Sequence, residues 1–139
     1  MSKKSLLSAT VVIEIPFHDC DPMQVVWHGN YARYLEVARC ELLRKINYDY
    51  LDMQASGYCW PIVDMRIKYV GSARFTQKIN VEANLVETES RLKIDYIISC
   101  NETGKKLTKA HTVQVAVDLV TEEMQFVSPQ VFLDKVAGL

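Results

Sequence analysis

The sequence predicts an α+β fold in which an antiparallel sheet lies over one long helix. Residues 31–46 repeat their hydrophobic side chains with the spacing of an α-helix. After residue 60, four stretches alternate hydrophobic and polar residues with the period of a β-strand, and short turns join them, which is typical of antiparallel pairing. Because neither a repeat nor a change of composition divides the chain, we expect residues 1–139 to form a single domain.

Composition and charge exclude several other classes of protein. Hydrophobic residues make up 49% of the chain and charged residues 24%, so the chain can bury enough apolar surface to fold, and a disordered polypeptide is excluded. The 16 Lys and Arg residues are balanced by 17 Asp and Glu residues, which gives a formal net charge of -1. Such a chain has no bulk attraction to phosphate backbones, so we expect no nucleic-acid partner.

The cysteines and the hydropathy indicate where the protein works. The 4 cysteines are widely spaced and form no C-x-x-C pair, and a chain of this length builds a core without disulfides. We therefore expect a cytoplasmic protein. No hydrophobic stretch approaches the roughly 18 residues that a membrane-spanning helix needs, so we expect no membrane span.

The first predicted strand covers residues 11–17. Pro16 cannot donate a backbone hydrogen bond, which favours an edge strand or a strand end at this point. The hydrophobic residues that alternate along one face of this strand are Val11, Ile13, Ile15 and Phe17.

The helical periodicity of residues 31–46 predicts one long amphipathic helix with Asn30 as its N-cap. We expect a loop or a broken second helix in residues 47–57. The hydrophobic residues that share one face of the long helix are Tyr31, Tyr34, Leu35, Ala38, Leu42 and Ile46.

The remaining chain predicts the sheet. Turns are expected at residues 87–90 and 101–105, and Ser128-Pro129 is expected to cap and begin a short C-terminal helix. A sheet of this length curls under its own twist, so the long helix is expected on its concave side. The predicted strands are residues 63–69, 79–85, 92–100 and 107–119, the last with Val113, Val115 and Val117 on its apolar face.

The segment that links the first strand to the helix, residues 17–31, holds the residues best suited to chemistry. It contains two acids, two histidines and a cysteine just before a helix N-terminus. Unpaired backbone N–H groups at such a terminus can stabilise a developing oxyanion, and a nearby carboxylate can act as a base or nucleophile on an acyl carbon. Turn chemistry alone also accounts for these residue types. The spacing matches neither a zinc H-E-x-x-H motif nor a P-loop, and no G-x-S-x-G elbow occurs, so we expect no metal site.

This segment resembles the signature of the hot-dog-fold acyl-CoA thioesterases. The closest types are the 4-hydroxybenzoyl-CoA thioesterases and the short-chain acyl-CoA thioesterases associated with the Tol-Pal system. The similarity consists of an Asp-x-Asp loop, a Val-Val-aromatic step before a histidine, and an Asn-Tyr pair that opens the helix. The matching residues are Asp19 to Tyr31, followed by Tyr34 to Arg39. The resemblance implies a hot-dog fold, in which a curved antiparallel sheet wraps around one long central helix.

The resemblance also implies a mechanism for hydrolysis of an acyl thioester. Asp21 would be the catalytic carboxylate, either as a nucleophile or as a general base for water. The backbone N–H of His28 would polarise the thioester carbonyl, and its imidazole is a candidate to assist. No cofactor is implied beyond the CoA or phosphopantetheine of the substrate.

The neighbours of these two residues are candidates for substrate binding. Trp27 is expected either to line the acyl pocket or to pack in the core or at an interface, and Gly29 to permit a backbone turn or a close approach of the ligand. Asp19 is expected to cap or brace the loop. Asn30 and Tyr31 complete the set of substrate-binding candidates.

A CoA substrate carries phosphate groups, so basic residues are expected near the mouth of the pocket. The hydroxybenzoyl type has a strongly basic turn where this chain has Glu87 to Arg91. An acyl carrier protein is therefore an alternative donor of the acyl group. The candidate phosphate ligands are Arg74, Lys78, Arg91 and Lys93.

The resemblance implies a homodimer or homotetramer with active sites at the subunit interface. Exposed sheet edges and apolar patches, which dimerisation would cover, are expected in such a fold. A non-catalytic module that binds acyl thioesters and a hot-dog hydratase or dehydratase remain alternatives. The length and aromatic character of the acyl group, which depend on tertiary packing, stay open.

Overall fold

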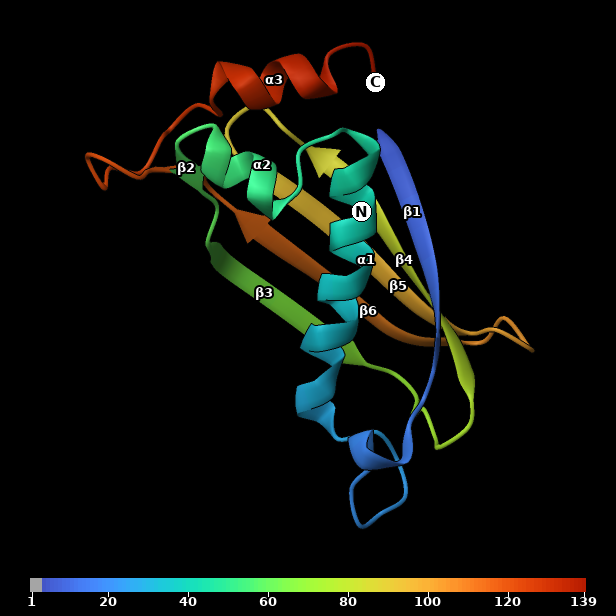
Figure 1. Ribbon diagram of the computed structural model, residues 1–139. Helices are drawn as coiled ribbons and strands as arrows, with labels where there is room; N and C mark the ends of the chain where they lie inside the picture. The colour runs from blue at the N-terminus through green and yellow to red at the C-terminus, as the bar shows by residue number, and fades with distance from the viewer. Residues whose placement is uncertain (1–3) are drawn as a thin grey trace.

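A computed structural model describes residues 4–139 and has one helix lying across a five-stranded antiparallel sheet (Figure 1). The strand order in the sheet is β1-β4-β5-β6-β3, so β1 and β3 are the edge strands, and β2 and β7 form a separate pair. The sheet strands are β1 (Leu7–Glu14), β3 (Ile62–Tyr69), β4 (Lys78–Glu87), β5 (Leu92–Cys100) and β6 (Lys106–Gln114). The other elements are β2 (Tyr58–Cys59), β7 (Val117–Asp118), the 3-10 turns η1 (Phe17–Asp19) and η2 (His28–Asn30), and helices α1 (Tyr31–Lys45), α2 (Tyr50–Ala55) and α3 (Gln130–Val136).

Helix α1 is the predicted long helix, and it packs on β1 and β4 (Figure 1). The six side chains predicted to share its apolar face are all buried. They belong to the same hydrophobic core as the alternating buried residues of β4 and β5. The apolar face of the helix and the apolar face of the sheet therefore form one core. The predicted α+β architecture is confirmed. Within residues 4–139, no helix has both the length and the hydrophobicity needed to cross a lipid bilayer.

The first strand begins and ends earlier than predicted. It pairs with β4 from Leu7 to Glu14, and the chain then turns into η1, so Pro16 follows the end of an edge strand as expected. Ile15 is buried, but Phe17 lies beyond the strand and is 75% exposed. The prediction that Phe17 belongs to the buried face was wrong, because the alternation of residue types continues past the last paired residue.

The last long strand is divided in two, and its inward face is polar. β6 ends at Gln114, and after a break β7 pairs with β2 instead of extending the sheet. Thr112 and Gln114 lie opposite the buried Ile94 and Leu92 of β5 and therefore face the helix. Val113 is buried as expected, but it lies opposite Lys93 and Asp64 on the other face of the sheet, and Val115 and Val117 follow the end of β6, so these three residues do not form one apolar strand face. Thr112 and Gln114 can be buried because each has a polar partner. The Thr112 hydroxyl lies 2.8 Å from the Tyr96 hydroxyl, and Gln114 Nε2 donates to the Trp60 carbonyl at 2.7 Å.

Two predicted caps do not form as expected. Asn30 occupies the N-cap position of α1, but its backbone is helical and its side chain makes no capping hydrogen bond. At the C-terminal helix, Pro129 is the N-cap, and the Ser128 hydroxyl donates to the Thr88 carbonyl at 2.5 Å. Both side chains bond to other segments of the chain instead. The undecided segment at residues 47–57 contains α2, which Asp49 and Asp52 cap reciprocally.

Edge strand β3 leaves apolar side chains uncovered. Its pairing with β6 places Ile67 opposite Ala110, on the face of the sheet that carries α1. Met65, opposite Thr112, and Ile62, opposite Gln114, belong to the same face, yet their side chains are 47% and 39% exposed. The strand was predicted correctly, but most of its hydrophobic side chains lie outside the core of the single chain.

Candidate active site

Residues 19–27 form a small hairpin that presents the predicted catalytic segment. The N–H of Trp27 donates to the Asp19 carbonyl at 3.0 Å, and the N–H of Asp21 donates to the Val25 carbonyl at 2.9 Å. Val26 then donates to the Ala73 carbonyl at 2.8 Å, which ties the hairpin to the segment before β4. The backbone therefore fixes where Asp21 and the start of the helix lie relative to each other.

Asp19 braces this hairpin against α1. Its side chain is 2% exposed, and its carboxylate accepts hydrogen bonds from the Tyr34 hydroxyl at 2.6 Å and from Arg33 Nη2 at 3.1 Å. Burial, followed by the hydrogen bond to Asp19, raises the pKa of Tyr34, so its hydroxyl remains a donor. The Asp19 carbonyl also accepts from Asn30 Nδ2 at 2.9 Å. Asp19 thus has the bracing role expected of it, and the Asn30 side chain holds the loop instead of capping the helix.

Asp21 lies at the turn of the hairpin. Its Oδ1 accepts the N–H of Met23 at 2.8 Å, which orients the carboxylate by a local turn. Gln24 completes the turn with a positive φ of 65°. Within residues 4–139 the Asp21 carboxylate makes no ion pair and is only partly buried, so it remains accessible. This differs from the enclosed carboxylate of Asp19, two residues earlier.

The turn η2 supplies free backbone donors next to the hairpin. The N–H groups of His28 and Gly29 stand at the start of this turn and have no acceptor in the described part of the chain. The His28 carbonyl accepts the N–H of Tyr31, where α1 begins, and the Tyr69 hydroxyl at 2.9 Å. Two donors on an anchored backbone can stabilise an anionic oxygen.

Trp27 and Gly29 are sterically linked. A β-carbon built on Gly29 would lie 2.3 Å from the nearest atom of the Trp27 ring. Gly29 lies in the 3-10 turn η2 without a positive φ, so the backbone conformation of this turn does not itself require glycine. The group that approaches it closely in this structure is the half-exposed Trp27 ring. Whether either residue contacts the substrate stays a prediction.

Tyr69 is a site residue that the sequence analysis did not single out. It is the last residue of β3, and its ring centroid lies 5.2 Å from that of Tyr31 and 6.3 Å from that of His28. Tyr31 is buried, and its hydroxyl accepts the N–H of Ala73 at 3.4 Å, so its side chain belongs to the core. The signal available in the sequence was the position of this aromatic residue at the end of the strand predicted for residues 63–69.

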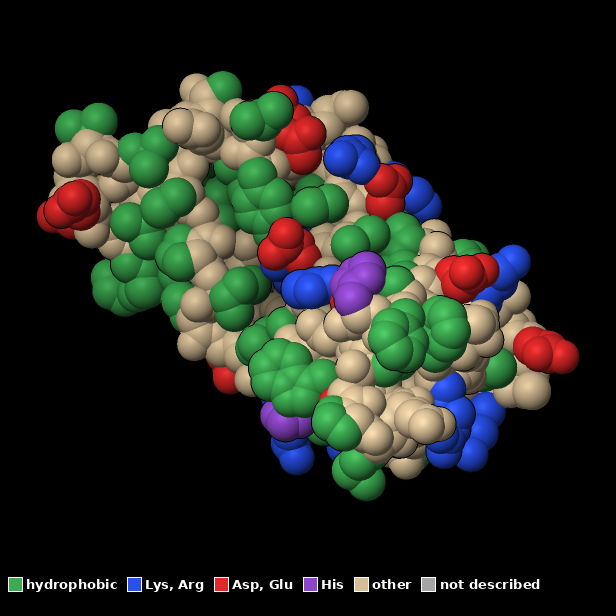
Figure 2. All heavy atoms as spheres, turned by 60° about the horizontal axis from the view of Figure 1, so that its bottom comes forward, with side chains coloured by type: hydrophobic (Ala, Val, Ile, Leu, Met, Phe, Trp, Pro, Cys, Tyr) green, Lys and Arg blue, Asp and Glu red, His purple; other side chains and the backbone are tan. Residues whose placement is uncertain are grey.

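Exposed hydrophobic side chains surround the hairpin. Phe17 and Phe75 form an edge-to-face pair with centroids 5.5 Å apart, and Met23, Trp27 and Tyr69 are exposed as well. Figure 2 brings this end of the molecule forward and shows hydrophobic side chains spread across it. This surface suits an apolar acyl group or a second protein chain.

The four candidate phosphate ligands do not form one cluster. Arg74 pairs with Val25 of the hairpin and lies at the candidate site, and Lys78 begins β4 a few residues later. Arg91 lies beyond the far end of β4, which at about 3.3 Å per residue is roughly 30 Å from Lys78. Its guanidinium is bonded to Glu87, and Lys93 lies opposite Glu87 on the same hairpin.

The arrangement provides two chemical functions. Asp21 offers an accessible carboxylate, and the backbone of His28 and Gly29 offers two N–H donors on the adjoining turn. Together they can attack, or activate water toward, a carbonyl carbon while stabilising its oxygen. Among residues 4–139, no group of three or more His, Cys, Asp or Glu side chains is placed to hold a metal ion.

Comparison with known proteins supplies the family. A family model described as the thioesterase-like superfamily matches residues 15–136. The Synechocystis protein sll0410, provisionally named an esterase, is 32% identical over 109 residues, which cover 78% of this chain and 66% of that protein, just under two thirds of its length. YneP of Bacillus subtilis, provisionally named an acyl-CoA thioesterase, is 29% identical over 107 residues, which cover 76% of this chain and 77% of YneP.

Solved structures agree with these matches. The structure of DHNA-CoA thioesterase from Staphylococcus aureus is 27% identical to this chain, with a TM-score of 0.77, and the match covers 84% of this chain and 78% of that one. The resemblance inferred from residues 19–39 and the hot-dog fold that it implies are confirmed.

Proposed function

The chain belongs to the thioesterase-like superfamily, and from this premise we propose that it hydrolyses an acyl-CoA thioester to a free acid and CoA. The observation that carries the proposal is the hairpin of residues 19–27, which ends where the free N–H groups of His28 and Gly29 begin the helical segment. CoA enters as part of the substrate, so the reaction needs no bound cofactor.

In this mechanism the thioester oxygen receives hydrogen bonds from the His28 and Gly29 N–H groups. Negative charge develops on that oxygen as the carbonyl carbon becomes tetrahedral, so fixed donors stabilise the transition state more than the ground state. The Tyr69 hydroxyl and the Tyr31 backbone N–H both donate to the His28 carbonyl. These two hydrogen bonds limit the motion of the peptide that carries the Gly29 N–H.

Asp21 has two routes available. As a nucleophile, its carboxylate attacks the carbonyl carbon, the C–S bond breaks, and the CoA thiolate leaves and takes a proton from solvent; water then hydrolyses the mixed anhydride and regenerates the carboxylate. As a general base, Asp21 removes a proton from a water molecule that attacks the same carbon. Both routes require the carboxylate, which the Met23 N–H orients.

A second copy of the chain, in a homodimer or homotetramer, completes the site in this proposal. Edge strand β3 carries Tyr69, which bonds to His28, and it also presents the exposed side chains of Val63 and Met65. A free strand edge next to uncovered hydrophobic residues favours pairing with another chain. Such a contact would cover the apolar surface beside the hairpin.

An acyl-carrier-protein thioester is the second candidate substrate. The observation in its favour is the ion pair between Arg91 and Glu87, which occupies the guanidinium of the turn that is strongly basic in the hydroxybenzoyl type. Lys93 lies opposite the same glutamate, so this turn offers little excess positive charge. Phosphopantetheine, which is common to both substrates, would still reach Asp21.

The experiment that tests the proposal is release of free thiol from a panel of short, long and aromatic acyl-CoAs. Turnover of any member supports the proposal, and the panel then gives the acyl preference. Absence of turnover on every acyl-CoA, together with turnover of an acyl carrier protein thioester, would favour the second candidate. Absence on both, with ligand-induced thermal stabilisation, would indicate a binding module instead.

A further inference from the structure

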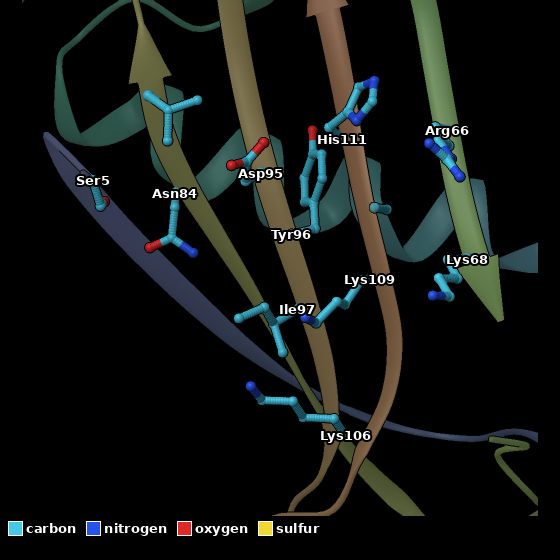
Figure 3. A pocket seen from close by; sticks show the side chains of 12 residues that line it. Ser5, Arg66, Lys68, Asn84, Asp95, Tyr96, Ile97, Lys106, Lys109 and His111 are labelled. Atoms are coloured by element: carbon cyan, nitrogen blue, oxygen red, sulfur yellow. The ribbon is translucent and has the colours of Figure 1, made fainter. Parts of the chain in front are cut away.

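A second site lies on the face of the sheet opposite α1. There, side chains of β3, β5 and β6 line an open groove of about 680 Å³, and Figure 3 shows them on the near face with α1 behind the sheet. Its wall includes Arg66 and Lys68 of β3 and Lys106 and Lys109 of β6. We call this the basic groove. Neither Asp21 nor His28 lines it.

The basic groove concentrates positive charge in a chain whose net charge is -1. None of its four Lys and Arg side chains forms an ion pair within residues 4–139. Among the described residues that line it, Asp95 is the sole carboxylate. Positive charge is therefore in local excess, although acidic residues slightly outnumber basic ones in the whole sequence.

Strand register places two of these cations against each other. Lys68 lies directly opposite Lys109 in the β3–β6 ladder, and like charges at directly opposite positions destabilise a sheet. On its other side, Lys109 lies opposite Ile97, whereas Asp95 lies opposite His111. The one carboxylate of the wall therefore does not stand opposite the lysine pair. A bound anion would remove the repulsion.

The rest of the wall suits the other end of a nucleotide-sized ligand. Ile97 of β5 supplies apolar surface between the cations of β6 and β3 and Asn84 of β4, and Val86 adds apolar surface next to Asn84 on β4. Asn84 Oδ1 accepts from the Ser8 hydroxyl at 2.6 Å, which leaves the amide N–H groups of Asn84 available to a ligand. Ligand pockets typically have volumes of about 300–1,000 Å³, and the volume of the basic groove lies within this range.

We propose that the basic groove binds a nucleotide-sized ligand with two or more phosphate groups. Arg66 offers its planar guanidinium for a paired contact with phosphate oxygens, and Lys68 and Lys109 hold the same anion from both sides of the ladder. The nucleotide part of a CoA molecule and a free nucleotide share this chemistry. Phosphate binding here does not depend on the hydrolysis proposed above.

The test measures binding by calorimetry, without turnover, using the full chain. The probes are 3′,5′-ADP, which is the nucleotide end of CoA, and ATP. The variant is the double substitution Lys68→Gln and Lys109→Gln, and the control is Lys135→Gln, which removes an exposed charge from α3. We expect the double variant to bind at least about tenfold more weakly and the control to bind as the wild type does. Binding should also weaken as salt is raised.

Kinetics distinguish the two sources of phosphate. If the groove holds the nucleotide of CoA, the double variant raises KM for an acyl-CoA but not for the matching acyl-pantetheine. If it holds a free nucleotide, ATP binds and both KM values stay unchanged. Either result supports the site, and the calorimetry stands even if no thioester is hydrolysed.

Three results would overturn the proposal. The first is that neither phosphate probe binds the wild type at millimolar concentration. The second is that the double variant binds as tightly as the Lys135→Gln control. The third is that an acidic carrier protein binds the groove while both nucleotides do not. Misfolding is checked by unfolding without ligand, where relief of the lysine pair should leave the double variant at least as stable as the wild type.

Discussion

The hydroxyl of Tyr69 donates a hydrogen bond to the carbonyl oxygen of His28 at 2.9 Å. This contact joins the end of edge strand β3 to the turn that opens α1, two segments about 40 residues apart in the sequence. The peptide whose oxygen accepts this bond contributes the Gly29 N–H on its other side. The edge strand therefore positions one of the two free backbone donors of the candidate site.

Substitution of Tyr69 by Phe should slow turnover without unfolding the protein. A hydrogen bond of this kind contributes about 0.5–1.5 kcal/mol. Expressed at the transition state, its loss lowers kcat by about two- to tenfold. Steady-state kinetics measure the effect, and Tyr58→Phe on β2 serves as the control because its hydroxyl makes no hydrogen bond within residues 4–139. Equal rates for the two variants would contradict a positioning role.

Asp21→Asn should abolish most turnover and leave the fold intact. The amide oxygen of Asn can still accept the Met23 N–H, so the local turn survives, but the side chain loses its charge and its capacity as a base or nucleophile. We expect kcat to fall at least about a hundredfold. Thiol release measures the loss, and Asp134→Asn on α3 controls for removal of a surface carboxylate. Near-normal turnover in Asp21→Asn would remove Asp21 from the mechanism.

His28→Ala should be milder than Asp21→Asn. Alanine keeps the backbone N–H and the carbonyl that Tyr69 and Tyr31 hold, and it removes only the ring that packs near Trp27 and Tyr69. We expect a loss of about tenfold or less in kcat. The comparison uses the same acyl-CoA and the same pH for all variants. A loss as large as that of Asp21→Asn would assign the imidazole a direct part in the chemistry.

The periodicity of hydrophobic residues correctly predicted the elements whose buried face is entirely apolar. The long helix was expected at residues 31–46 and is observed as Tyr31–Lys45, and β5 runs from Leu92 to Cys100 as predicted. The same rule failed at β6, where Thr112 and Gln114 face inward because Tyr96 and Trp60 supply hydrogen-bonding partners. One partner lies on β5 and the other in the link between β2 and β3, so alternation along β6 could not reveal them.

The candidate site was predicted in its position but not in its contacts. The two acids of the loop were identified from the sequence, yet the division between an enclosed Asp19 and an accessible Asp21 depends on Tyr34 and Arg33, which only the folded helix brings to Asp19. The basic groove was not predicted at all. Lys68 and Lys109 are neighbours only through the register of β3 and β6, and each alone has the sequence context of a solvated strand residue.

Gly29→Ala should move the Trp27 ring and change substrate affinity more than stability. The added β-carbon would meet the outer atoms of the ring at 2.3 Å, so the ring must swing away. Trp27 is 50% exposed and the backbone of Gly29 has no positive φ, so the swing costs little, about 1 kcal/mol or less in unfolding free energy. Tryptophan fluorescence reports the displacement, because the other tryptophan, Trp60, is buried elsewhere. We expect KM for the preferred acyl-CoA to rise.

The matched control is the same substitution in a Trp27→Leu background, where the smaller side chain removes the clash and Gly29→Ala should have little further effect. An equal rise in KM in both backgrounds would mean that the glycine makes room for the ligand itself.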